Sequence, residues 1–405
     1  MFKLFTLSRE ERRILMYLSL MPPEGVAVRD FRQWAQLASN AEIKSLERRS
    51  WIIKNTQGIA LHPIIRQVIR CEIPATEENC ADFIGRFSET ITPFYTWHMR
   101  KTDKDRYAAV AKSVISCFPL VTAATAELYL NVESLMSFAV DPAQAAVLIK
   151  KYWDYCAKTY PELSYETGFA AFKRGWLYAY NPQLPDSVRQ ACIWLKKSCD
   201  IFECIPMTNP EQQAAYSQNL SNLSKMQLVL YSRSGDPADY ALAMEYAQKA
   251  LDFSVATFHR GQSEYIKVAN SHWHLSNALY AGGAYEEALE NIDIAIDILV
   301  EFRTEHDSDS LYALFHKAET LYALGDVAEA EKLARKSGDG YIEFFGMSHP
   351  NVYLIFDLLG RCRADLGDVA GALEAFDTAL QTAKMIYAPG TEQITGMEAK
   401  IAQCK

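Results

Sequence analysis

Several features that mark other classes of protein are missing from this sequence of 405 residues. None of its nine cysteines stands in a Cys-x-x-Cys pair, which argues against a zinc site or a disulfide framework and fits reduced thiols in a cytoplasmic protein. The longest apolar stretches, such as residues 292–300, are interrupted by acidic residues, so we expect no membrane-spanning segment. The N-terminus also lacks the apolar core of a secretory signal. The phosphate-loop pattern Gly-x-x-x-x-Gly-Lys-Ser/Thr is absent, and we therefore expect no triphosphate site in this chain alone.

No arrangement of residues suggests a catalytic centre or a metal site. His272 and His274 are two residues apart on an expected helix, so their side chains point about 200° apart and cannot share a metal ion. The carboxylates fall at the spacings of solvent-facing helix surfaces. The sequence therefore predicts a protein that is not an enzyme and binds no metal.

Charge is distributed unevenly along the chain. Residues 1–72 hold 12 Lys and Arg against 7 Asp and Glu, whereas residues 73–405 hold 29 against 43. A basic head on an acidic body favours either attraction between protein parts or contact with nucleic acid. Both interpretations stay open at this point.

An internal repeat is the strongest signal in the sequence. Gly283, Gly325 and Gly367 are 42 residues apart, and each is followed five residues later by Ala. A small residue also stands seven positions before each glycine, and these residues are Ser276, Ala318 and Gly360. Small side chains let two antiparallel helices cross closely, and glycine permits the tight turn between them. Helix pairs of this kind leave an apolar face that only the next pair covers, so they stack into a superhelix.

These repeats resemble the tetratricopeptide-repeat (TPR) family, and their 42-residue period with the 346–350 linker is similar to the repeats of kinesin light chains. Less regular copies at residues 164–204 and 235–250 extend the array backwards to about five helix pairs. We therefore expect a mainly α protein in which residues 161–405 form a right-handed α-α superhelix of TPR units. Residues 73–160 are expected to be a helical spacer.

The first 72 residues predict a smaller module. Ser8 and Glu11 have the spacing of a capping box, and two further helices are expected before residue 50. The pattern then alternates on both sides of residues 55–58, which predicts a β-hairpin, and Pro63 opens another helix. Three helices and a hairpin indicate a winged-helix domain over residues 1–72.

The winged-helix region resembles that of the STAND signal-transducing NTPases, which include the NB-ARC and NOD-like proteins. The resemblance rests on Leu7-Ser8, Trp51-Ile52, Gly58-Ile59 and Leu61-His62-Pro63 with the apolar residues between them. In that family an NTPase module precedes the winged helix, repeats such as TPRs follow it, and the histidine matching His62 contacts bound ADP. The resemblance thus implies that His62 senses nucleotide, with ADP or ATP as cofactor, only together with an NTPase module absent from this chain. The alternative is that His62 merely caps or packs at its strand-to-helix junction.

The resemblance to TPR proteins also implies a binding groove. In that family the first helix of each pair lines a concave surface with its second, fifth, sixth, ninth and twelfth consensus positions. Asparagine there can bind an extended peptide backbone through both donor and acceptor, and aromatic rings offer large rigid contact areas. The corresponding residues in this sequence are Asn222, Lys225, Asn270, Trp273, His274, Asn277, Tyr280, Tyr312, Phe315, His316, Glu319, Tyr322, Asp357 and Arg361. Some of the aromatic members could instead pack between repeats.

We therefore expect a sensor in a bacterial-type signal or defence switch. Its TPR groove binds a peptide or protein trigger, and its winged helix relays this event to an NTPase module. One alternative is a peptide-responsive transcription regulator whose winged helix binds DNA through Lys44, Arg48, Arg49 and Lys54. Another is a TPR adaptor in which the winged helix only packs. The chain is then either the C-terminal portion of a larger switch or a stand-alone protein.

Overall fold

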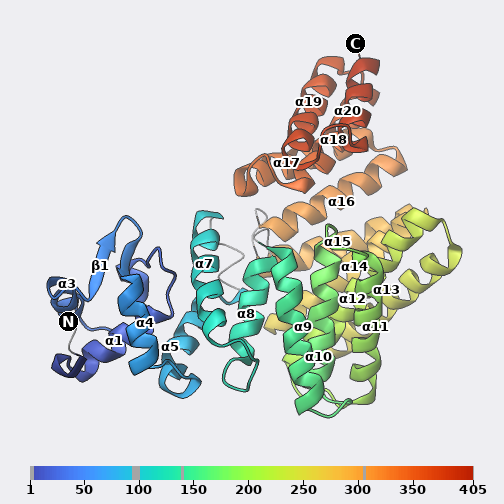
Figure 1. Cartoon of the computed structure of the whole chain (residues 1–405). Coiled ribbons are helices and arrows are strands. Elements are labelled where there is room, and N and C mark those ends of the chain that lie inside the picture. Colours follow the sequence, from blue (N-terminus) through green and yellow to red (C-terminus); the bar gives the residue numbers. More distant parts are fainter. Residues whose placement is uncertain (1–3, 94–100, 138–140, 304–306, 405) are drawn as a thin grey trace. The chain divides into compact units, whose positions relative to one another are not determined.

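The structure is a computed structural model that describes residues 4–93, 101–137, 141–303 and 307–404. It is mainly α-helical (Figure 1). The chain divides into two compact units, Met1–Ile205 and Pro206–Lys405. The elements of the first unit are η1 (Leu4–Thr6), α1 (Arg9–Ser19), α2 (Val28–Ala35), α3 (Ala41–Arg48), β1 (Ile52–Asn55), β2 (Gly58–Leu61), α4 (Pro63–Glu72), α5 (Glu77–Thr90), α7 (Lys101–Cys117), α8 (Ala126–Ser137), α9 (Pro142–Thr159), α10 (Tyr165–Tyr180) and α11 (Ser187–Cys204). Those of the second are α12 (Pro210–Ser234), α13 (Pro237–Thr257), η2 (Ser263–Tyr265), α14 (Ile266–Ala281), α15 (Tyr285–Phe302), α16 (Ser308–Leu324), α17 (Val327–Phe345), α18 (Pro350–Asp365), α19 (Val369–Ile386) and α20 (Glu392–Gln403).

Local signals in the head produce the expected elements. The capping box is present at α1, where the Ser8 hydroxyl accepts from the Glu11 N–H at 3.0 Å and the Ser8 N–H donates to the Glu11 carboxylate at 2.9 Å. Strands β1 and β2 pair antiparallel, with Asn55 opposite Gly58. The Asn55 side-chain oxygen accepts from the Gly58 N–H at 3.1 Å and thereby closes the turn.

Gly58 also lets a third segment join the hairpin. Val26 bridges to Ile59 beside it, and a Cβ on Gly58 would lie 2.1 Å from the Val26 carbonyl oxygen. The φ of Gly58 is +126°, a conformation that L-residues with side chains rarely adopt. The order in the head is therefore helix, bridging residue, two helices and hairpin.

One hydrophobic core runs through the first unit. It begins at Leu7 in the head, continues through Phe83 of α5 and Leu135 of α8, and extends to Leu177 of α10 and Leu184. Trp34 of α2 makes edge contacts with Phe83 (6.2 Å between ring centroids) as part of this core. The head and the helices after it thus contribute to one hydrophobic core. The domain boundaries expected at residues 72 and 160 stay predictions.

Small residues lie where paired helices cross, as the repeat predicts. Helix α14 packs on α15, α16 on α17, and α18 on α19. Ser276 is buried at the first of these crossings, and its hydroxyl donates to the Ala288 carbonyl at 2.7 Å. Gly360 lies at the third, where a Cβ would come within 2.4 Å of the Phe376 ring. The turn residue Gly325 has a φ of +89°, so the expected glycine turn is confirmed there.

Candidate ligand-binding face

The candidate site lies on the first helices of successive pairs in the second unit. We call α12, α14, α16 and α18 the inner helices; along the chain, each inner helix contacts the next one. On α14, Asn270, Trp273, His274 and Asn277 are three, four and seven residues apart, which places them on one side of the helix. We call the predicted groove residues on these four helices the inner face.

Aromatic rings from two inner helices meet at the centre of the inner face. The ring centroids of Trp273 and Tyr312 are 5.4 Å apart, those of Tyr312 and His316 are 4.6 Å apart, and those of Trp273 and His316 are 5.7 Å apart. All three residues are half-buried, so parts of their rings can still meet a ligand. Phe315 differs, because only 3% of it is exposed and it belongs to the hydrophobic core. The ring of Phe315 therefore packs against that of Tyr312, with 5.8 Å between centroids, and offers little contact area to a ligand.

Asn270 and Asn277 lie on α14 three residues before and four residues after Trp273. Both are half-buried, and within the described part of the chain neither side chain makes a hydrogen bond. The Nε1–H of Trp273 between them is buried and also has no acceptor within the described part of the chain. The Trp273 N–H is thus withdrawn from water without a partner, which costs free energy that a ligand acceptor would recover, whereas the two amides are open to water and to a ligand.

His274 is neutral on the inner face. Burial, together with the nearby charges of Lys225 and His316, lowers the pKa of His274 to about 3. Its neighbour His272 lies elsewhere on the helix, where its Nδ1 is 2.8 Å from the Asn291 side-chain oxygen. Among the described residues no three His, Cys, Asp or Glu side chains gather as metal ligands.

The charged groove residues on α18 are paired with one another and with neighbouring helices. Arg361 lies 3.5 Å from Asp357 and sits over the Tyr322 ring at 5.0 Å. Asp357 also pairs with Lys400 of α20, and the Tyr322 hydroxyl donates to Asp365 at 2.8 Å. This end of the inner face is therefore occupied by internal ion pairs.

The remaining predicted residues lie on α16, α14 and α12. Glu319 is 3.0 Å from Nδ1 of His316 and holds that ring. Tyr280 is half-buried near the end of α14, with its ring 5.4 Å from Tyr285. Asn222 is fully buried, and Lys225 is half-buried with its charge acting on His274.

Sequence reasoning missed two polar residues beside the groove positions. Lys267 precedes Asn270 by one helical turn, and its Nζ donates to the Gln218 side chain of α12 at 3.1 Å. Burial is the largest cause that lowers the pKa of Lys267. Its three-residue spacing from Asn270 was a usable signal, because residues three apart on a helix are neighbours.

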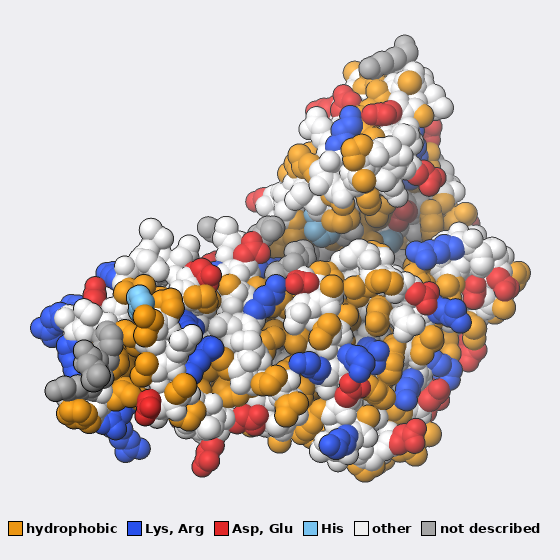
Figure 2. All heavy atoms as spheres, in the orientation of Figure 1, with side chains coloured by type: hydrophobic (Ala, Val, Ile, Leu, Met, Phe, Trp, Pro, Cys, Tyr) orange, Lys and Arg blue, Asp and Glu red, His pale blue; other side chains and the backbone are white. Residues whose placement is uncertain are grey.

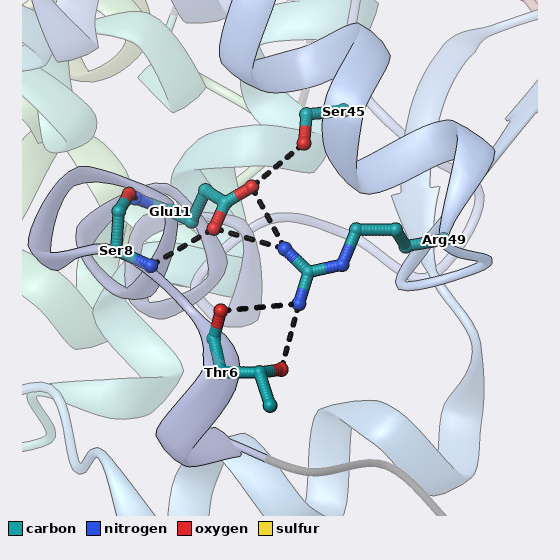
Figure 3. A network of polar contacts seen from close by, with 5 residues as sticks. All are labelled: Thr6, Ser8, Glu11, Ser45 and Arg49. Carbon is teal, nitrogen blue, oxygen red and sulfur yellow. Dashed lines mark hydrogen bonds and ion pairs between the residues drawn. The ribbon is translucent and has the colours of Figure 1, made fainter.

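In the head, the polar residues singled out from the sequence serve the local structure. Nδ1 of His62 accepts from the Ile64 N–H at 3.3 Å and so caps α4, whose first residue is Pro63. Arg49 donates to both carboxylate oxygens of Glu11 at 3.1 Å (Figure 3). Other Lys and Arg side chains gather at the edge of the head that carries α3 (Figure 2).

No protein-family model and no curated protein matches this sequence. Solved structures do match it. A Rap protein complexed with Competence and Sporulation Factor is 15% identical with a TM-score of 0.50, over 84% of this chain and 93% of that one. The chain has a TPR-like fold.

Two further structures with lower TM-scores are also similar. A STAND protein with a tetratricopeptide-repeat sensor from Pyrococcus horikoshii is 15% identical, with a TM-score of 0.48, over 99% of this chain and 66% of that one. A tetratricopeptide-repeat protein from Parabacteroides merdae is 12% identical, with a TM-score of 0.46, over 79% of this chain and 98% of that one. The chain thus spans 66% of the STAND protein's length. In the described part of this chain, no helix is both long and apolar enough to cross a bilayer.

Proposed function

We propose that the inner face of the second unit binds an extended peptide or protein segment and that this binding is regulatory. The observation that carries the proposal is the pair of half-buried side-chain amides, Asn270 and Asn277, without partners in the described part of the chain. A peptide backbone offers alternating donors and acceptors, and an asparagine amide can match both. The neighbouring Trp273 and Tyr312 supply rigid contact area.

The spacing of the two amides suits an extended backbone. Seven residues of α-helix rise about 10.5 Å, which equals about three residues of an extended strand. Asn270 and Asn277 can therefore hold two peptide groups of one segment about three residues apart. Because Asp357 and Arg361 already pair with one another, we expect the ligand's main contacts on α14 and α16.

The test is a selection of peptides that bind the whole chain. Random peptides of about 15 residues, which in extended form reach well past both amides, are displayed on phage and selected on the immobilised protein. Single changes Asn270→Ala and Asn277→Ala are then expected to weaken the selected peptides about 2- to 12-fold each, the cost of about 0.5–1.5 kcal/mol per lost hydrogen bond. Binding is measured by isothermal titration.

Asn291→Ala is the matched control for these two changes. Asn291 is also half-buried in the second unit, but its amide is already bonded to His272 and to the Glu287 carbonyl. Its removal should leave peptide affinity unchanged. The proposal is wrong if no peptide is enriched, or if the selected peptides bind the Asn270→Ala and Asn277→Ala variants as well as the wild-type protein.

The finer part of the proposal concerns the head. Residues 1–72 act as a winged helix that relays ligand binding to an NTPase module, with His62 as the nucleotide-sensing residue in that assembly. The element order of the head and the exposed position of His62 support this proposal. An immunoblot of the source cells tests it, because a native product well above 45.8 kDa is expected. A band at 45.8 kDa favours instead a regulator or adaptor that works without an attached NTPase.

Contact with DNA is the weaker proposal for the head. Of the four cations considered for it, Arg49 is bonded to Glu11 and Thr6 and is thus held away from phosphate. Phosphate-driven binding falls steeply with salt. Duplex DNA is therefore titrated at about 0.15 M salt. Binding that persists there supports DNA contact by the head, and binding lost by that point is nonspecific attraction only.

A further inference from the structure

A pocket of about 430 Å³ lies beside α2 in the head, outside the inner face. Its walls come from one side of α2 and from the connection between α2 and α3. We call it the α2 pocket, and its lining residues are Val28, Arg29, Arg32, Gln33, Leu37 and Asn40. A pocket of this volume suits a small molecule or a single side chain of a partner.

The α2 pocket is positively charged. Arg29 is exposed and makes no hydrogen bond or ion pair within the described part of the chain. Arg32 donates through Nη2 to the carbonyl oxygens of Leu37 and Ala38, at 3.4 and 3.2 Å. None of the described residues that line the pocket carries a carboxylate. Two arginine charges therefore lie at one pocket without a counter-charge in its walls.

The acidic residues nearby do not balance Arg29. Arg29 also lines a second hollow, in which Asp30 and Asp103 lie with Arg106. Arg106 is 3.3 Å from Asp30 and 3.1 Å from Asp103. Both carboxylates are thus already paired with a different cation.

Two polar atoms in the walls of the α2 pocket are buried without a partner. Within the described part of the chain, the Nε–H of Arg32 finds no acceptor and the side-chain oxygen of Asn40 finds no donor. Asn40 directly precedes α3, but its side chain makes no capping bond to that helix. Burying such groups without partners costs free energy that a bound ligand recovers. One donor and one acceptor are therefore available beside the two charges.

We propose that the α2 pocket binds a small phosphate monoester that also carries a hydrogen-bond donor, such as a hydroxyl or amide group. A phosphate monoester carries a charge of about −1.5 to −2 at neutral pH, which balances two arginines. Its oxygens accept from Arg29 and Arg32, because the planar N–H groups of guanidinium match phosphate oxygens. The added donor bonds to Asn40, and Val28 and Leu37 contact the carbon skeleton. The head thus has a ligand of its own, independent of the peptide proposed for the inner face.

The test is isothermal titration of the whole chain at about 0.15 M salt, where charges far apart are screened. The probes are inorganic phosphate, glucose 6-phosphate and N-acetyl-phosphoserine amide. At least one of the two monoesters is expected to bind with a Kd below about 1 mM and more tightly than inorganic phosphate, which has no carbon skeleton. Preference for glucose 6-phosphate would identify a free metabolite as the source of the phosphate, and preference for the phosphoserine amide a phosphorylated protein segment.

Arg29→Gln should weaken the preferred monoester about tenfold or more, because a hydrogen bond to a charged group is lost. Arg29→Lys keeps the charge and should keep part of the affinity. Asn40→Ala should weaken binding about 2- to 12-fold. Neither side chain makes a hydrogen bond within the described part of the chain, so these variants should keep the wild-type melting temperature. The bound monoester should also slow hydrogen exchange at residues 36–41, because it joins α2 to the residue before α3.

Arg48→Gln is the matched control, because Arg48 is an exposed cation of the head on α3 that does not line the α2 pocket. It removes the same charge and should leave the affinity for the monoester unchanged. The proposal is wrong if neither monoester binds with a Kd below about 1 mM, or if Arg29→Gln and Arg48→Gln weaken binding equally. It is also overturned if duplex DNA displaces the monoester and its own binding depends on Arg29, because phosphates of nucleic acid would then fill the pocket.

Discussion

Replacing Glu11 should destabilise the first unit far more than its position on the surface of a helix suggests. Only 7% of Glu11 is exposed, and its carboxylate accepts from the Ser8 N–H, from the Ser45 hydroxyl at 2.8 Å, and from Arg49 (Figure 3). This one side chain thereby joins the start of α1 to α3. Glu11→Ala removes the carboxylate half of the capping box, leaves the Ser45 hydroxyl without its acceptor, and leaves Arg49 bonded to Thr6 alone.

The size of the effect follows from these contacts. Loss of the hydrogen bond from the Ser8 N–H to the Glu11 carboxylate costs about 1 kcal/mol. Loss of the charge-assisted bonds to Ser45 and Arg49 costs about 1–2 kcal/mol more, reduced because Arg49 is 36% exposed to water. The total of about 2–3 kcal/mol corresponds to a fall of roughly 4–12 °C in the melting temperature of a unit of this size.

Urea unfolding with hydrogen exchange of peptides from residues 1–72 measures this change within the whole chain. Glu10→Ala is the control, because Glu10 makes a surface pair with Arg13 one turn apart and should cost less than about 0.5 kcal/mol. The double change Glu11→Ala with Arg49→Ala should cost less than the two single changes added together, by about 1 kcal/mol. Full additivity, or a cost for Glu11→Ala no larger than for Glu10→Ala, would refute the reasoning.

The same contacts make the stability of the first unit depend on pH. Burial raises the pKa of Glu11, but the hydrogen bonds from Ser8 and Ser45 and the charge of Arg49 outweigh it, so that the net pKa is lowered from 4.5. The folded state therefore binds this proton less well than the unfolded state. The stabilisation is fully present above pH 4.5 and is lost as the pH falls through the lower folded pKa. The head of Glu11→Ala should lack this loss in acid.

Two further predictions concern the second unit. Gly360→Ala should destabilise it by about 1–3 kcal/mol in urea unfolding, because the added methyl group would meet the Phe376 ring at 2.4 Å. The control is Gly396→Ala in α20, which has no atom within 4 Å of its Cβ and should stabilise the unit by up to about 1 kcal/mol. Equal effects of the two changes would contradict the close packing at the α18–α19 crossing. His274 has its pKa lowered from 6.5 to about 3, so the stability that it contributes is present above pH 6.5 and declines toward pH 3, by at most about 2 kcal/mol at pH 5. His274→Asn should flatten the unfolding curve between pH 6.5 and 5, and an unchanged slope would mean that His274 is solvated.

Much of the fold could be predicted from the sequence because its signals act over a few residues. The spacing of small residues and turn glycines marks each helix pair, since only small side chains permit the crossing that Ser276 and Gly360 make. The capping box and the hairpin turn at Asn55 depend on neighbours within three residues. The TPR-like fold and the mainly α class were accessible for the same reason.

Which side chains of the candidate site have partners depends on contacts between residues far apart in the sequence. A helical period shows which residues share a face, but not which of them find partners on the next helix. Asp357 bonds with Lys400 and Phe315 lies in the core, whereas Asn270 and Asn277 have no such partner among the described residues.

In the head, too, the sequence shows that Arg49 is a cation, but not that the fold pairs it with Glu11. By itself the sequence determined the helices, their turns and the repeat that stacks them, because these follow from local spacing. Only the tertiary structure decided which polar and aromatic groups of the described residues bond or pack internally, because that depends on how the side chains of successive helices meet.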